Sequence, residues 1–168
     1  GQPGSTNPFR LSPPPVVDLR GLLPINGAYI QRTLPAIKYL VVHHSGADYD
    51  SSGEEIARYH IQKYDWPGCG YQYVIRWDGT IEQAWDLTVM SYNVARRNHE
   101  VVGICLVGDY TSRQPWPEQI TSCRWLLAEL LKILPGREIV GHRDIALPGF
   151  ETACPGEMWE AWRLDVLP

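Results

Sequence analysis

The fold is decided by the stretch Tyr39-Leu40-Val41-Val42-His43-His44-Ser45, in which apolar residues lead into two adjacent histidines and a turn at Gly46. A run of this composition that ends in turn residues is typical of a buried central strand. Because side chains alternate between the faces of a strand, His43 shares a face with Val41, and His44 points the other way. Only one histidine can therefore lie in a given site. From this stretch alone, a hydrogen-bonded core histidine is as good an interpretation as a metal ligand.

The length and charge of the chain limit the function classes. The 168 residues correspond to one domain. The net charge is −4, from 15 basic and 19 acidic residues without a basic cluster, which argues against a nucleic-acid partner. No apolar run approaches the roughly 18 residues of a membrane span, so we expect no membrane insertion. The many Tyr and Trp residues suit a carbohydrate or peptide groove, and they suit core edges equally well.

The N-terminal residues differ in composition from the rest. Residues 1–15 are rich in Gly, Pro and Ser and end in three prolines, which predicts a Pro-rich arm or linker. Residues 16–168 then form the domain. Four cysteines are present. If a metal takes one of them, at most one disulfide remains, and Cys105 with Cys123 is a candidate pair because their elements are expected to pack together.

Helical and strand patterns alternate along the domain. An alternating segment at 70–77 turns at Asp78-Gly79 into a strand at 80–83, as in a hairpin. The other predicted elements are a helix over 53–64 capped by Ser51 or Ser52, a strand at 101–107, a helix over 117–134, a strand at 138–140, and a last helix from Cys154-Pro155-Gly156 to Trp162. We therefore predict an α/β single domain with a central mixed β-sheet flanked by helices.

Candidate metal ligands lie at separate points of this pattern. They are His43 or His44, then His142, then Cys154. Two imidazoles and a thiolate suit Zn²⁺, and three protein ligands leave a position open, as in a catalytic site. The spacing alone is a weak signal, because it is not that of a zinc finger. His60 is most simply interpreted as a core or helix-face histidine.

The local contexts of these residues strengthen the signal. Five blocks occur in order: Val-Val-His-His-Ser-Gly at 41–46, Gly-Tyr-Gln-Tyr-Val-Ile-Arg-Trp-Asp-Gly-Thr-Ile at 70–81, Val-Gly-Ile-Cys-Leu-Val-Gly-Asp at 102–109, Gly-His-Arg-Asp at 141–144 and Thr-Ala-Cys-Pro-Gly at 152–156. Together they resemble the type 2 N-acetylmuramoyl-L-alanine amidases, a family that includes amidase-type phage lysozymes and the peptidoglycan recognition proteins. The resemblance covers about residues 37–162.

The resemblance implies a role for individual residues. The zinc ligands fall on His43, His142 and Cys154, at one edge of the sheet, and His44 becomes a structural neighbour. The active-site tyrosine falls on Tyr71. Thr152 takes a position that holds lysine or threonine in active members. Tyr71 could orient the attacking water or donate a hydrogen bond to the oxyanion, and Thr152 could donate similarly.

Departures from the family pattern refine the expectation. Cys105 stands where some cytoplasmic members carry an acidic residue, which places this chain nearer the phage-lysozyme and recognition-protein branch. Asn93 stands where a histidine is common, and we expect this change to affect substrate contact more than metal binding. Glu82 is interpreted as a solvated carboxylate of the hairpin.

The function implied by the resemblance is zinc-dependent hydrolysis of the amide bond between N-acetylmuramic acid and L-alanine in peptidoglycan. The alternative is a non-catalytic peptidoglycan-binding module, since some members lack the metal cysteine and only recognise the wall. The expected partners are peptidoglycan and muropeptides, with the protein acting as a monomer. The expected location is secreted or cell envelope, or phage-encoded with release in the host.

Overall fold

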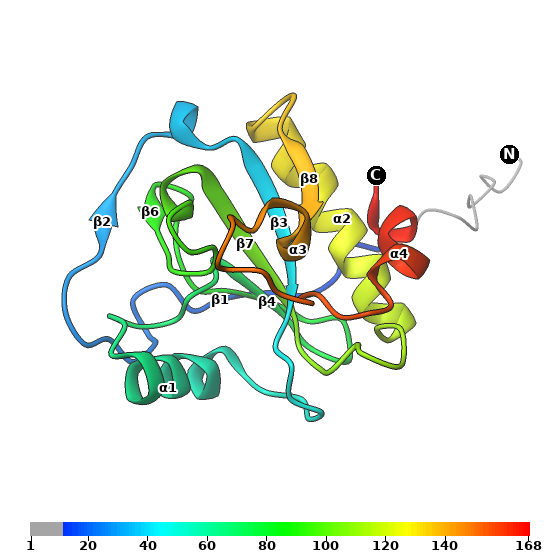
Figure 1. Ribbon diagram of the computed structural model, residues 1–168, viewed down its shortest axis with the longest axis horizontal. Helices are drawn as coiled ribbons and strands as arrows, with labels where there is room; N and C mark the ends of the chain where they lie inside the picture. The colour runs from blue at the N-terminus through cyan, green and yellow to red at the C-terminus, as the bar shows by residue number, and fades with distance from the viewer. Residues whose placement is uncertain (1–11) are drawn as a thin grey trace, which may run out of the picture.

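The structure is a computed structural model, and it describes residues 12–168 (Figure 1). Most of the predicted arm, residues 1–11, lies outside the described residues. Sheet pairing begins at Pro15, whose carbonyl accepts a hydrogen bond from the Ile81 N–H at 2.9 Å. Among the described residues, no helix is long and apolar enough to cross a membrane.

A six-stranded mixed sheet forms the centre of the molecule, in the order β1-β5-β4-β7-β3-β8. Its strands are β1 (Val16–Asp18), β3 (Tyr39–His44), β4 (Tyr73–Ile75), β5 (Ile81–Gln83), β7 (Val101–Leu106) and β8 (Glu138–Gly141). The β4–β5 hairpin is antiparallel, and the other pairings are parallel. The predicted α/β fold with a mixed sheet is confirmed.

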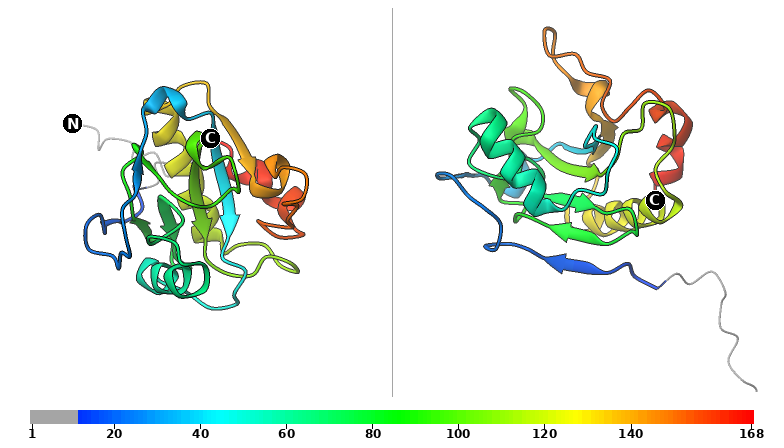
Figure 2. Two further views of the ribbon diagram at one scale, coloured as in Figure 1. Left: turned by 60° about the vertical axis from the view of Figure 1, so that its left-hand side comes forward. Right: turned by 90° about the horizontal axis from the view of Figure 1, so that it is seen from below.

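Two longer helices flank the sheet (Figure 2). Helix α1 (Gly53–Tyr64) starts at the Ser52 cap, which forms a reciprocal capping box with Glu55. Helix α2 (Pro117–Ile133) has proline in its first turn, where the missing N–H costs no helical hydrogen bond. Both helices lie where the sequence predicts them.

Shorter elements complete the domain. They are β2 (Ile30–Gln31) paired with β6 (Val89–Met90), η1 (Leu34–Ala36), η2 (Asn98–Glu100), α3 (His142–Ile145), α4 (Trp159–Trp162) and η3 (Arg163–Val166). The last helix therefore begins later than predicted. Cys154 and Pro155 form a turn before it, and this turn holds the cysteine beside β3 rather than on a helix.

The strand predicted at 70–77 is also shorter, because β4 covers only Tyr73–Ile75. The Gln72 side chain occupies the place of a regular ladder bond: its amide oxygen accepts from the Gly103 N–H at 2.7 Å. The alternation breaks there. Tyr71 packs with Val74 on one face, whereas Tyr73 packs on the other, so the alternation predicted over 70–77, which would put Tyr71 and Tyr73 on the same face, was wrong at Tyr71.

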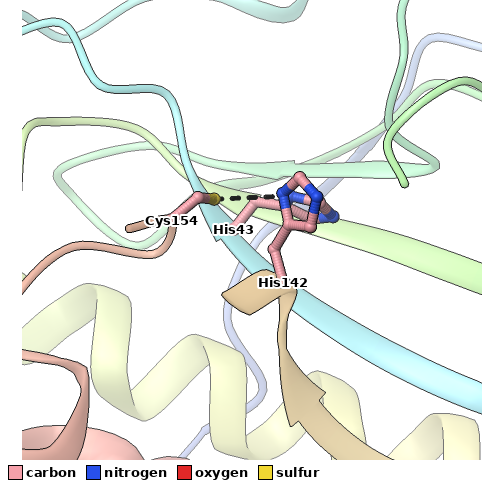
Figure 3. Close-up of side chains that lie close together, drawn as sticks. All are labelled: His43, His142 and Cys154. Atoms are coloured by element: carbon pink, nitrogen blue, oxygen red, sulfur yellow. Dashed lines mark hydrogen bonds between the residues drawn. The ribbon is translucent and has the colours of Figure 1, made fainter. Parts of the chain in front are cut away.

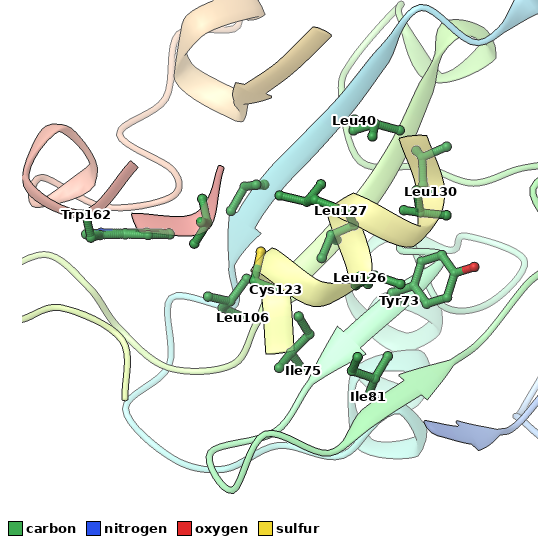
Figure 4. Packing of buried hydrophobic residues seen from close by; sticks show 14 of the residues in the cluster. Leu40, Tyr73, Ile75, Ile81, Leu106, Cys123, Leu126, Leu127, Leu130 and Trp162 are labelled. Carbon is green, nitrogen blue, oxygen red and sulfur yellow. The ribbon is translucent and has the colours of Figure 1, made fainter. Parts of the chain in front are cut away.

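The main apolar core lies between the sheet and α2 (Figure 4). It includes Leu40 and Val42 of β3, Leu127 and Leu130 of α2, and Trp162 of α4. Cys123 is buried in this core as a free thiol, and the four cysteines of the chain are all free. The candidate disulfide between Cys105 and Cys123 is not formed.

Candidate metal centre

Three side chains from distant parts of the chain meet at the carboxyl ends of β3 and β8 (Figure 3). The ligand atoms of His43, His142 and Cys154 all lie within 4.8 Å of one another. His43 is at the end of β3, His142 follows β8 directly, and Cys154 is in the turn before α4. The structure therefore brings together the three residues that the sequence singled out as candidate ligands.

Strand β3 presents His43 to the site as alternation requires. His43 is only 1% exposed, and its Nδ1 atom lies 3.5 Å from Cys154 Sγ. His44 points away from this cluster, and its Nδ1 atom accepts a hydrogen bond from the Tyr110 N–H at 3.1 Å. The two adjacent histidines thus have different partners, and His44 has the structural contact expected of it.

The Gly-His-Arg-Asp block fixes His142 relative to the cysteine turn. The Arg143 N–H donates to the Cys154 carbonyl at 2.8 Å, which ties the two segments together. Asp144 Oδ2 accepts from the Gly141 N–H at 2.7 Å and from Trp159 Nε1 at 2.9 Å. A Cβ on Gly141 would lie 2.6 Å from the Trp159 side chain, so only glycine allows this packing. The Gly-His-Arg-Asp block therefore holds the His142 imidazole in a fixed position relative to Cys154.

Burial sets the protonation of the three candidate ligands. It lowers the pKa of His142 to about 4, and it lowers the pKa of His43 well below 6.5, with His142 adding to the effect. Both imidazoles are therefore neutral at pH 7, with a lone pair available. Burial raises the pKa of the Cys154 thiol to about 12, so this thiol keeps its proton until a cation replaces it.

The donor set decides which metal fits. Two neutral imidazoles and one thiol match the nitrogen and sulfur preference of Zn²⁺, whereas Mg²⁺ and Ca²⁺ prefer oxygen ligands. Three donors are one fewer than a closed structural zinc site uses. The residues present therefore fit a zinc ion of the catalytic kind.

The cluster lies in the wall of a cavity of about 480 Å³. Tyr71 and Thr152, the two predicted catalytic residues, line the same cavity. The Tyr71 ring centroid is 5.1 Å from that of His43. Burial raises the pKa of Tyr71 well above 10, so the phenol is protonated and can donate a hydrogen bond. Thr152 Oγ1 accepts from the Cys154 N–H at 3.1 Å, which leaves its own proton free to donate.

Other residues of the cavity wall were not assigned a role from the sequence. Tyr64 and Trp66 stack with ring centroids 4.5 Å apart and an interplanar angle of 25°. His60 is buried beside them, and its Nδ1 atom accepts from the Gly70 N–H at 2.9 Å. The sequence interpretation of His60 as a buried helix-face residue is confirmed, with the addition that its ring borders the cavity. Tyr64 is the last residue of α1, inside the predicted helix, and Trp66 follows the end of that helix. Neither was assigned a place at the cavity from the sequence.

The structure corrects the expectation for Glu82 and adds a contact to the one for Asn93. Glu82 is not a solvated carboxylate, because its side chain is 12% exposed and its Oε1 atom accepts from the Gly53 N–H at 2.8 Å, at the start of α1. Asn93 lines the cavity as expected of a substrate contact, but its amide oxygen also lies 3.0 Å from His43 Nε2. It therefore touches a candidate ligand directly.

Comparison with known proteins agrees with this geometry. The family model described as N-acetylmuramoyl-L-alanine amidase matches residues 33–157, most of the chain. The chain belongs to this family. The match includes all the amidase-family residues named above, from His43 to Cys154.

Relatives of this amidase-family chain fall into two groups. Peptidoglycan-recognition protein SC2 of Drosophila melanogaster is 26% identical over 144 residues, 76% of either chain. The endolysin of Enterobacteria phage K11 is 31% identical over 121 residues, which are 69% of this chain and 77% of the endolysin. The solved structure of the endolysin amidase LysCS from Clostridium intestinale has the same fold, with a TM-score of 0.73 at 23% identity over 92% of this chain and 97% of LysCS. The family thus supports an amidase with a peptidoglycan-related role.

Proposed function

We propose that this chain is a zinc-dependent amidase that hydrolyses the bond between N-acetylmuramic acid and L-alanine in peptidoglycan. The observation that carries the proposal is the convergence of His43, His142 and Cys154 in a cavity that also holds Tyr71 and Thr152. A site for recognition alone needs no such donor set. We propose that peptidoglycan and muropeptides are the partners, and that the protein acts as a monomer.

The chemistry that bound zinc supplies is Lewis acidity toward a carbonyl oxygen and activation of a water molecule. The residues of the chain orient the other groups. The phenol of Tyr71 donates a hydrogen bond to the oxygen of the scissile amide as negative charge develops on it, a contribution of order 10²–10³ in rate. Thr152 is held by the Cys154 N–H and donates to the same region. The protein surrounds this step with buried side chains, which strengthens each hydrogen bond.

The place of action follows from the proposed substrate. A cell-wall amide is reached from outside the cell, from the envelope, or from inside a host that a phage lyses. We therefore propose that the protein is secreted, located in the envelope, or encoded by a phage and released in its host. The similarity to the phage K11 endolysin supports the last of these.

The second candidate function is recognition of peptidoglycan without cleavage, which the similarity to recognition protein SC2 favours. The two differ in product. The amidase releases free stem peptide from muropeptides without new reducing sugar ends, whereas a recogniser binds them unchanged. Zinc content alone does not separate the two functions.

The test is stem-peptide release by the purified zinc-loaded protein, measured by chromatography and mass spectrometry. We expect release that stops on chelation and returns when zinc is added. Cys154→Ser should abolish turnover, with circular dichroism as the check on folding. Binding of muropeptides by the wild type without any release would overturn the amidase proposal in favour of recognition.

A further inference from the structure

Asn93 lies between the candidate ligand His43 and the backbone behind it. Its Oδ1 atom is 3.0 Å from His43 Nε2. An amide oxygen only accepts hydrogen bonds, so the imidazole must donate from Nε2. A neutral imidazole carries a single proton, and His43 therefore keeps its lone pair on Nδ1. That is the nitrogen 3.5 Å from Cys154 Sγ, on the side of the candidate ligand cluster.

The orientation of the Asn93 amide is set by two further partners. Its Nδ2 atom donates to the Gly70 carbonyl and to Ser91 Oγ, each at 2.9 Å. A flipped amide would place its oxygen against the Gly70 carbonyl, so that two acceptors faced each other, and would present N–H groups to His43. The hydrogen-bond network thus specifies that the oxygen faces the imidazole.

The backbone at Asn93 is also fixed. Asn98 Oδ1 accepts from the N–H groups of Asn93 and Val94, both at 2.8 Å. On the sheet side, Asn93 lies against Gly103 of β7, where a Cβ would be 2.7 Å from the Asn93 amide carbon. Only glycine at this position of the central strand leaves space for the amide. Both the loop and the strand therefore hold Asn93 in place.

We propose that Asn93 is a positioning residue, which accepts the Nε2 proton of His43 and so directs the Nδ1 lone pair toward the metal site. The proposal rests on the zinc site proposed above. Groups that hydrogen-bond the outer nitrogen of a metal-bound histidine fix its tautomer and orientation, and their loss costs about 10–100-fold in metal affinity. Asn93 supplies this contact with a neutral amide, so it adds no charge to the site.

The first test uses the metal-free wild-type protein. The ¹⁵N chemical shifts of the histidine side chains report which nitrogen carries the proton, and the His43 signals are those missing from a His43→Gln variant. We expect protonated Nε2 and unprotonated Nδ1 in His43 at about pH 7.5. A predominant Nδ1–H form would overturn the proposal. This measurement needs neither zinc nor substrate.

The second test is zinc affinity, measured by competition with a chromophoric chelator. Asn93→Leu has a similar shape and no acceptor, and we expect it to weaken zinc binding about 10–100-fold. Ser91→Ala is the matched control, because it removes one donor contact of Asn93 and leaves the His43 contact. Equal zinc affinity in Asn93→Leu and wild type would contradict the proposal.

Failure of this proposal can be told apart from failure of the proposed function. If the wild-type protein binds zinc and cleaves no muropeptide, the proposed amidase function is refuted. The role of Asn93 is then still decided by the tautomer of His43 and by the zinc affinity of the Asn93 variant. If the wild-type protein cleaves muropeptides and His43 is in the Nδ1–H form, only the proposed role of Asn93 is refuted. If Asn93→Leu does not fold, the wild-type tautomer decides the proposal without it.

Discussion

The side chains that alternate along β3 and β7 enter two different environments. Toward α2, β3 contributes Leu40 and Val42 to the main apolar core, which α2 covers with apolar residues and with the buried polar residues Gln119 and Ser122. On the opposite face, the same strand contributes His43, and the buried polar residues His60 and Gln72 lie there too. Every one of these three makes a named hydrogen bond. The comparison teaches that the face toward α2 is stabilised mainly by its large apolar core, whereas the opposite face combines smaller apolar clusters with buried polar groups held in specific orientations.

The largest expected effect on stability lies on the α2 face. Leu127 is fully buried, and Leu127→Ala should lower the free energy of unfolding by about 2–5 kcal/mol through lost burial and a residual cavity. Activity per folded molecule should not change. Urea unfolding and stem-peptide release measure the two quantities. If Leu127→Ala kept the wild-type free energy of unfolding, or if the fully folded variant turned over more slowly, the α2 face would not act on stability alone.

After the loss expected for Cys154→Ser, the next largest effect on activity is expected at Tyr71, on the other face. Tyr71→Phe removes one hydroxyl from the cavity and should lower kcat roughly 10²–10³-fold, because the hydrogen bond to the developing charge is lost. Zinc affinity and the unfolding midpoint should stay close to wild type. Single-turnover kinetics with a muropeptide measure the effect. An unchanged rate would refute a role for the hydroxyl.

The buried His60 should make the free energy of unfolding depend on pH. Burial lowers the pKa of His60 from 6.5 to about 4, so as the pH falls the unfolded chain binds a proton before the folded one. The stability that His60 contributes is complete above pH 6.5 and is lost progressively toward pH 4. Between pH 6.5 and about 5.5 the loss is about 1 kcal/mol.

This dependence is measured by urea unfolding of the metal-free protein at both pH values, for wild type and His60→Gln. The difference between the two proteins isolates His60, because the other titrating groups are shared. A loss of stability that is the same in both proteins would show that His60 does not carry the effect.

The smallest expected effect is on the solvent side of α1. Arg58 pairs with Glu54 at 2.8 Å across one helical turn, and both side chains are more than half exposed. Such pairs contribute about 0.3–0.5 kcal/mol. Arg58→Ala should therefore change the unfolding midpoint only slightly and leave turnover unaltered. A large loss of either would show that the outer face of α1 takes part in function.

The difference between the faces also explains what the sequence could predict. Apolar periodicity located β3, α1 and α2, because burial against the core leaves a regular pattern. It failed around Tyr71, where the Gln72 side chain replaces a ladder bond and breaks the alternation of the strand. It also began the last helix too early, since Cys154 and Pro155 form a turn whose position depends on contacts far away in the chain.

The candidate site was found through short blocks of residue types rather than through periodicity. Those blocks named His43, His142, Cys154, Tyr71 and Thr152, and the structure places all five around one cavity. The contact between Asn93 and His43 could not be predicted in the same way. It joins residues 50 positions apart, and an asparagine in a loop carries no pattern that identifies its partner.

The separation of His43 and Cys154 by 111 residues has a consequence for biosynthesis. Because a chain is synthesised from its N-terminus, the residues of β3 are added long before Cys154, whose thiol lies beside His43 in the folded protein. The donor set is complete only after the segment beyond β8 has folded back onto the sheet. Because a ligand that binds only the native state stabilises it by mass action, the proposed zinc ion would favour chains that have folded through Cys154 over partly made ones. Retention of the proposed metal would therefore distinguish chains that include the cysteine turn from those truncated before it.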